Sequence, residues 1–132
     1  MLEMALVLPL FIILAAGVLY FGKVLYAYIA ADMASYDCVR TSAEALHAGN
    51  GQQQGRTAAI DTMRGFYMSD ITPRVTVYAP HGWKRGRPVR CRVEYNVSLA
   101  GMPLIGMLNV PQKIHIQSDT ALRIEQYKSR WE

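Results

Sequence analysis

The sequence predicts an α+β fold in which a long N-terminal helix, first hydrophobic and then amphipathic, packs on a small antiparallel β-sheet domain. Two observations support this prediction. Residues 4–22 contain no charged side chain, and the chain from residue 74 onwards contains segments in which apolar and polar residues alternate. A long apolar run is typical of a buried or membrane-embedded helix, and strict alternation is typical of a strand with one buried face.

The uncharged run is long enough to cross a membrane. As a helix it would extend about 28 Å, which is close to the thickness of the hydrocarbon core of a bilayer. A cleavable signal peptide is the alternative, but such a peptide has a basic start and a shorter apolar core. This chain instead opens with Met1-Leu2-Glu3. We therefore expect residues 1–22 to be a membrane helix and residues 23–132 to form one domain.

The helix is expected to continue well beyond the apolar run. Small and apolar residues recur at helical spacing through residues 23–48, and Gly49-Asn50-Gly51 then offers a C-terminal cap. One helix of about 45 residues and about 65 to 70 Å is predicted. Pro9 lies inside it and is expected to kink or locally unwind it, since proline removes one backbone hydrogen bond.

The second half of the chain is expected to contain a short helix and three strands. Gln52 to Gly55 is interpreted as a polar linker, followed by a helix over residues 57–70. The strands are predicted at about residues 74–79, 88–99 and 112–125, with a turn-rich hairpin tip at residues 80–86.

The two cysteines, Cys38 and Cys91, lie on the predicted helix and on the apolar face of the second predicted strand. Outside the cytoplasm a disulfide between them is the favoured interpretation. The alternative is two small buried thiols.

The sequence does not indicate an enzyme. His47, His81 and His115 are far apart and lack cysteine or carboxylate neighbours at metal-ligand spacing, so we expect surface histidines and no metal. No phosphate-binding loop or nucleophile motif is present, so neither a catalytic site nor a cofactor is expected.

The positive charge is concentrated in the C-terminal half. Residues 1–72 contain four Lys or Arg against six Asp or Glu, whereas residues 73–132 contain ten against four. Trp83, Lys84, Arg85 and Arg87 form a possible contact surface for anionic lipid or nucleic acid. The favoured interpretation of this basic stretch is a solvated face, because Arg90 and Arg92, which follow it, lie on the polar face of the second predicted strand.

Glu3 stands out because a carboxylate at the start of a membrane helix is unfavourable in lipid. One explanation is an interfacial position, where the helix dipole favours a negative charge. The other is a positive partner in a neighbouring subunit, such as a free N-terminal amine. The residues alone leave these two explanations equal.

The run from Leu2 to Leu10, followed by Gly17, Phe21-Gly22 and an Ala- and Tyr-rich helix, resembles the TadE-like family of the tight-adherence (Tad/Flp) branch of type IV pilus systems. Thr120 to Glu125 looks like the end of the family's C-terminal strand. The sequence departs from the family pattern at Met4, where an aromatic residue is usual, and the printed residues show no glycine before Met1.

The resemblance implies a lollipop-shaped, pilin-like structural subunit with an extracytoplasmic domain. It implies processing by a prepilin peptidase after a glycine, which would leave a glutamate near the start of the mature helix, and Glu3 matches that glutamate. It also implies a single-pass protein of the cytoplasmic membrane that later enters an extracellular pilus or a periplasmic or cell-surface assembly. Other copies, other pilins and the assembly platform are the implied partners. The residues implied in subunit assembly are Glu3, Met4, Leu8, Pro9, Gly17, Phe21 and Gly22.

A different class of function is a membrane-anchored binding module that does not assemble and presents its basic hairpin to anionic lipid or nucleic acid. Nucleic acid is not the expected partner of the pilin-like subunit.

Overall fold

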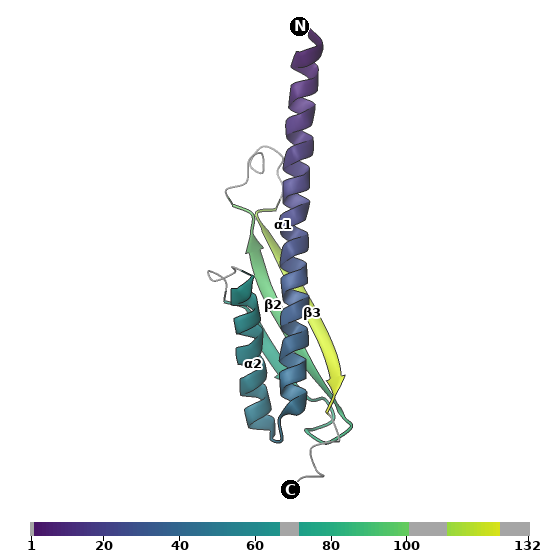
Figure 1. Cartoon of the computed structure of the whole chain (residues 1–132), viewed down its shortest axis with the longest axis vertical. Coiled ribbons are helices and arrows are strands. Elements are labelled where there is room, and N and C mark those ends of the chain that lie inside the picture. The colour runs from purple at the N-terminus through teal and green to yellow at the C-terminus, as the bar shows by residue number, and fades with distance from the viewer. Residues whose placement is uncertain (1, 67–71, 101–110, 125–132) are drawn as a thin grey trace.

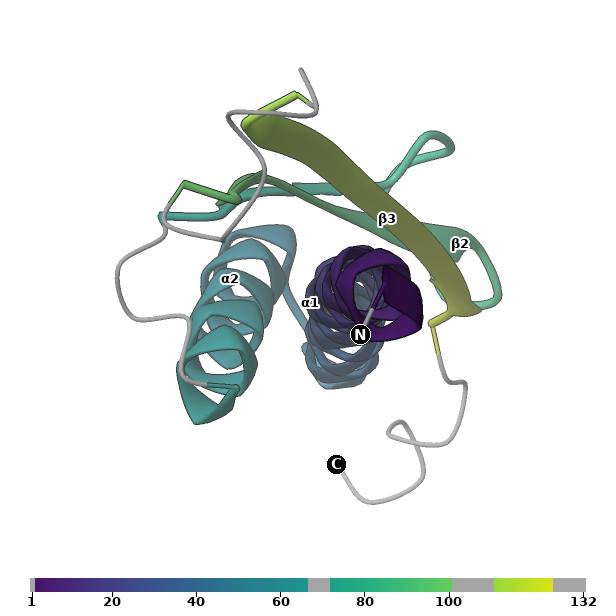
Figure 2. The ribbon, with the colours of Figure 1, turned by 90° about the horizontal axis from the view of Figure 1, so that it is seen from above.

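The computed structural model describes residues 2–66, 72–100 and 111–124, without the side chains of Leu2, Glu3 and Ala5. It contains helices α1 (Leu2–Glu44) and α2 (Ala48–Gly65) and strands β1 (Arg74–Tyr78), β2 (Pro88–Ser98) and β3 (Lys113–Arg123). Both helices lie on one face of the sheet, and the N-terminal half of α1 extends beyond α2 and the sheet (Figures 1 and 2). The predicted α+β class is confirmed.

Helix α1 forms the axis of the molecule. Its 43 residues extend about 65 Å, and the helix continues through Pro9 without an interruption in its assignment. The local unwinding expected at Pro9 is therefore wrong, whereas the expected kink stays a prediction. The helix ends at Glu44, before the predicted boundary at residue 48.

Helix α2 corrects the prediction for residues 49–56. We expected Gly49-Asn50-Gly51 to end the first helix and Gln52 to Gly55 to be a linker, but α2 begins at Ala48 and includes all of these residues. Two of the glycines are buried against α1. A Cβ atom on Gly51 would overlap the ring of Trp83, and one on Gly55 would overlap Ser42 Oγ. These glycines therefore allow close packing rather than ending a helix.

The sheet has the strand order β1-β2-β3, and both pairs are antiparallel. In β2, side chains alternate between the core and the outer face. Its buried side chains are Val89, Cys91, Val93, Tyr95 and Val97. This period of two matches the alternation in the sequence, because successive side chains of a strand point to opposite faces.

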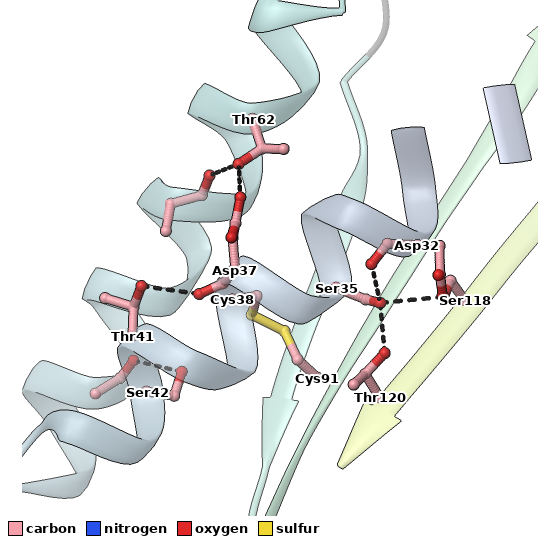
Figure 3. Close-up of a disulfide and its surroundings, with 12 residues drawn as sticks. Asp32, Ser35, Asp37, Cys38, Thr41, Ser42, Thr62, Cys91, Ser118 and Thr120 are labelled. Carbon is pink, nitrogen blue, oxygen red and sulfur yellow. Dashed lines mark hydrogen bonds between the residues drawn. A yellow bond between two sulfur atoms is a disulfide. The ribbon is translucent and has the colours of Figure 1, made fainter. Parts of the chain in front are cut away.

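A disulfide joins Cys38 of α1 to Cys91 of β2, with the two Cα atoms 6.2 Å apart. Both cysteines are fully buried. Because Cys91 lies on the helix-facing side of the central strand, the bond ties the middle of the sheet directly to α1 (Figure 3).

Short polar side chains fasten α1 to β3. Ser35 Oγ lies 3.1 Å from Ser118 Oγ and 2.7 Å from Thr120 Oγ1. Ser118 also donates to Asp32 Oδ1 at 3.1 Å (Figure 3). Buried hydroxyl groups need such partners, so these bonds favour one position of β3 along the helix.

Tyr95 connects β2 to α1 near the centre of the core. Its ring is buried, and its hydroxyl donates to the carbonyl oxygen of Ala27. Burial disfavours the charged phenolate and raises the pKa of Tyr95 to about 12.

Replacing both cysteines by alanine should lower the free energy of unfolding by up to about 4 kcal/mol, because the disulfide closes a loop of 53 residues in the unfolded chain. Denaturant unfolding of the full chain in detergent, followed by near-UV circular dichroism, measures this loss. Non-reducing peptide mapping of exported protein should recover Cys38 linked to Cys91. Recovery of both as free thiols would contradict the prediction.

Gly55→Ala should destabilise the domain by about 1 to 3 kcal/mol, the range for overpacking a tight interior. Besides the overlap with Ser42, the added Cβ would lie 3.0 Å from the backbone oxygen of Cys38. Gly49→Ala is the matched control in the same helix, since a Cβ there meets nothing within 4 Å. It should be neutral or stabilising by up to about 1 kcal/mol. Equal effects in denaturant unfolding would contradict close packing at Gly55.

The stability of the domain should depend on Tyr95 at alkaline pH. Between the ordinary pKa of 10.0 and the folded value of about 12, the unfolded chain releases the phenolic proton while the folded chain keeps it. The free energy of unfolding therefore falls as the pH rises through this window. Tyr95→Phe should reduce that fall, and Tyr28→Phe, on the exposed side of α1, is the control. Identical pH profiles for wild type and Tyr95→Phe would exclude this role.

Candidate membrane-anchoring and assembly helix

The described elements of the domain leave most of the N-terminal half of α1 uncovered, although Tyr20 is partly buried and packs against the core. Among the described side chains from Met4 to Tyr26, none is buried, and Ala27 is the first that is. Large apolar side chains are exposed all round this segment, including Phe11 at 69% and Leu14 at 61%. Water is a poor environment for an apolar surface of this length, so lipid or other protein must cover it.

By length and composition, α1 is long and apolar enough to cross a membrane, and it is the one such helix in the part of the chain that the structure describes. The first charged residue after the apolar run is Lys23, whose ammonium group donates to the carbonyl oxygen of Ser98 at 2.9 Å. This contact lies where the helix meets the domain, so the apolar segment and the domain are joined at a defined point.

The predicted assembly residues lie along this uncovered segment. Met4, Leu8 and Phe21 are 76%, 61% and 68% exposed. A Cβ atom on Gly17 or on Gly22 would meet nothing within 4 Å, so packing within this chain does not require glycine at either position. Pro9 is also exposed. The side chain of Glu3 lies outside the described residues, and its role stays a prediction.

The predicted contact surface at the hairpin is divided by the structure. The Trp83 ring is half-buried beside the core, and its indole Nε1 donates to the carbonyl oxygen of Ala45 at 3.3 Å. Trp83 thus fastens the hairpin to the end of α1, where backbone carbonyls lack helical partners. Lys84, Arg85 and Arg87 are exposed.

The outer face of the sheet carries a small group of charges. Asp119 Oδ2 lies 3.7 Å from Arg90 and 3.4 Å from Arg92. Such exposed pairs contribute little to stability. They fit the expected solvated face of the strand.

The described residues contain no group of three His, Cys, Asp or Glu side chains placed to hold a metal ion. His115 Nδ1 instead lies 3.0 Å from Asn96 Oδ1 on the exposed face of the sheet.

Sequence reasoning missed two contributions to this arrangement. One is the packing of the Trp83 ring against Gly51. The available signal in the sequence was the spacing of four residues between Gly51 and Gly55. The other is the pairing of Thr62 with Asp37, whose Oδ2 accepts from the threonine at 2.7 Å. No local pattern links those two residues.

The family model described as TadE-like protein matches residues 1–40. No curated protein and no solved structure matches the chain. The match covers the apolar segment and the first part of α1 that packs on the domain, whereas Thr120 to Glu125 lies outside it. TadE-like proteins form a structural family associated with the Tad pilus. Residues 1–40 of this chain are therefore similar to TadE-like proteins, which confirms the predicted resemblance to that family.

Proposed function

We propose that this protein is a pilin-like structural subunit of a Tad pilus and that it assembles through the N-terminal half of α1. The observation that carries the proposal is the uncovered apolar segment at one end of an unbroken helix whose other end is fixed in a domain. Such a helix is stable in lipid before assembly and in a bundle of similar helices afterwards, because both environments remove its apolar surface from water.

The domain is attached firmly enough to move with this helix. Cys38 is bonded to β2, and Ser35 is hydrogen-bonded to β3, so the C-terminal half of α1 is part of the core. A subunit built in this way would bring its domain to the outside of a filament when its helix enters the centre. This is the arrangement that we propose.

Glu3 is proposed to bind a positive group of a neighbouring subunit, such as a free N-terminal amine. Once the helix is surrounded by apolar side chains, a lone carboxylate is unfavourable, and a positive partner offsets that cost. Processing by a prepilin peptidase belongs to the same proposal, and the mass of the mature N-terminus tests it. In this assembly pathway, the cytoplasmic membrane is the first location and the pilus the last.

The alternative module, with a basic hairpin that binds lipid, is less well supported by the geometry. The hairpin is fixed to Ala45 at the end of α1, which lies about 33 Å along the helix from Lys23. The exposed charges at Lys84, Arg85 and Arg87 therefore lie far from the membrane that would hold the apolar segment. Lipid of that membrane does not fit as their partner.

Glu3→Ala should reduce the amount of this protein in sheared pili about tenfold or more, because breaking a buried charge pair costs about 3 to 5 kcal/mol. Quantitative mass spectrometry of the pilus fraction and of the membrane fraction measures the effect. Asp61→Ala removes an exposed carboxylate of α2 and is the control. Undiminished incorporation of Glu3→Ala would contradict the proposed role of Glu3.

The pilus fraction of the wild type also shows whether this protein is a repeating subunit of the filament or an accessory assembly subunit. Electron microscopy with subunit stoichiometry should show either a repeating subunit or a trace component, and a trace amount means an accessory assembly subunit. Absence of this protein from pili and from their assembly complexes, with a bound lipid or nucleic acid instead, would favour the binding module.

A further inference from the structure

Four positive side chains gather at one end of the domain. They are exposed and come from the hairpin between β1 and β2 and from the end of β3: Lys84, Arg85, Arg87 and Arg123. These four residues are called the basic cluster below. The hairpin lies at the end of the molecule opposite the N-terminus (Figure 1). Like charges that are held close together repel one another, so a negative partner stabilises such an arrangement.

Backbone hydrogen bonds bring the basic cluster together. The amide of Arg87 donates to the carbonyl oxygen of Lys84 at 3.1 Å, so the chain forms a tight turn there. The amide of Gly86 donates to the carbonyl oxygen of Ile124, and the amide of Ile124 donates to that of Arg87, both at 3.0 Å. These two bonds place the turn beside Arg123, because paired strands are about 5 Å apart.

The turn is fixed to the rest of the domain. Gly86 has a φ of +76°, a left-handed conformation that glycine adopts without strain and that lets the chain reverse direction. Directly before the turn, the indole Nε1 of Trp83 donates to the carbonyl oxygen of Ala45 at 3.3 Å. The backbone that carries the positive charges is therefore ordered before any ligand binds, which lowers the entropic cost of binding.

The described carboxylates leave the basic cluster without a counter-charge. Asp119 pairs with two arginines of β2, at 3.7 and 3.4 Å. Glu44 lines a small hollow together with Arg85, but it pairs with Arg40 at 3.8 Å. In the part of the chain that the structure describes, no ion pair involves a residue of the basic cluster.

The membrane that anchors α1 is too far away to supply the negative partner. Trp83 is bonded to Ala45, which lies about 33 Å along the helix from Lys23 at the end of the apolar run. The headgroup layer of a bilayer extends only about 5 to 8 Å beyond the hydrocarbon core. The partner of the basic cluster is therefore an anion outside this membrane.

The side chains of the basic cluster suit a polymer with repeated acidic groups. Three of the four are arginines, whose planar guanidinium groups bind a carboxylate or a phosphate through two parallel hydrogen bonds. Neighbouring guanidinium groups on the turn and on β3 can hold successive acidic groups of one chain. A single small anion would engage only part of the cluster.

The surroundings of the basic cluster favour an acidic polysaccharide over a nucleic acid. Proteins usually hold single strands by stacking the bases on exposed aromatic rings. The one tryptophan of the hairpin, Trp83, instead packs its ring against Gly51. Proteins usually read duplexes with a helix or a two-stranded ribbon that enters a groove. A four-residue turn bonded to the end of β3 provides neither element, whereas a polymer of acidic sugars requires neither.

We propose that the basic cluster binds an acidic polysaccharide, a polymer of sugars that carry carboxylate groups, outside the membrane in which α1 is anchored. The unpaired charges of the turn and of Arg123, side by side at the far end of the domain, carry the proposal. The binding needs the folded domain but no filament, so it goes beyond the proposed pilus role.

Binding of fluorescent polygalacturonate to the purified full chain in neutral detergent tests the proposal. The cluster variant changes the three bases of the turn: Lys84→Gln, Arg85→Gln and Arg87→Gln. It should bind at least about tenfold more weakly than the wild type, because charge contacts dominate the affinity for a polyanion. The matched control changes three exposed bases elsewhere in the chain: Arg56→Gln, Arg74→Gln and Lys113→Gln. Both variants lower the formal net charge of +4 by three, but the control should bind within about twofold of the wild type.

Three results would overturn the proposal. One is equal weakening in both variants, which would mean that net charge alone attracts the polymer. Another is wild-type binding to polygalacturonate that is no tighter than binding to neutral dextran. The third is tighter binding of the wild type to single-stranded or double-stranded DNA than to polygalacturonate. An intact Cys38–Cys91 bond by peptide mapping shows that both variants fold.

Single substitutions on β3 test whether the turn and this strand form one site. Arg123→Gln should weaken the binding of polygalacturonate about twofold to fivefold, the range for one exposed charge contact. Lys113→Gln, at the other end of the same strand, should leave the binding unchanged. Equal effects of the two substitutions would exclude Arg123 from the site. All of these measurements use purified protein without pili, so this proposal and the pilus role tested by Glu3→Ala can fail separately.

Discussion

Close packing around Cys38 is the constraint on which the rest of the structure depends. At this point α1 is bonded to Cys91 of the central strand, and Gly55 of α2 approaches so closely that a Cβ there would lie 3.0 Å from the Cys38 backbone oxygen. The disulfide fixes the sheet, and the glycine admits the second helix. Neither a larger residue at Gly55 nor a shift of the sheet along α1 is compatible with both contacts.

This central contact lets one helix serve two environments. Its C-terminal half is anchored in the domain by the disulfide and by the hydrogen bonds of Ser35, so its N-terminal half projects in a defined direction. The small residues of the inner side, such as Ala27 and Ala34, make the domain compact. Large apolar residues of the outer side, such as Ile29 and Tyr36, are about half exposed. Membrane anchoring and the proposed filament role therefore use the N-terminal half of this helix, and its C-terminal half belongs to the domain.

The polar contacts have a different role from the apolar ones. The hydroxyl groups of Ser35, Ser118 and Thr120 replace apolar packing between α1 and β3, where each buried donor needs a partner. Trp83 has a similar effect at the end of α1, because its indole satisfies a carbonyl that the helix leaves open. These contacts add little burial, but they favour one register of the sheet on the helix.

By itself, the sequence determined the long helix, the three strands, the pairing of the cysteines that we favoured and the TadE-like character of the first residues. These features follow from local periodicity and from a motif within one segment, which is why they are readable without a structure. Only the tertiary structure decided that residues 48–56 are helical, where Gly51 admits the ring of Trp83 and Gly55 admits the close approach of α1. It likewise placed Trp83 against the core and separated the two sides of α1. Which side of a helix is covered depends on elements far away in the chain, and no local pattern contains that information.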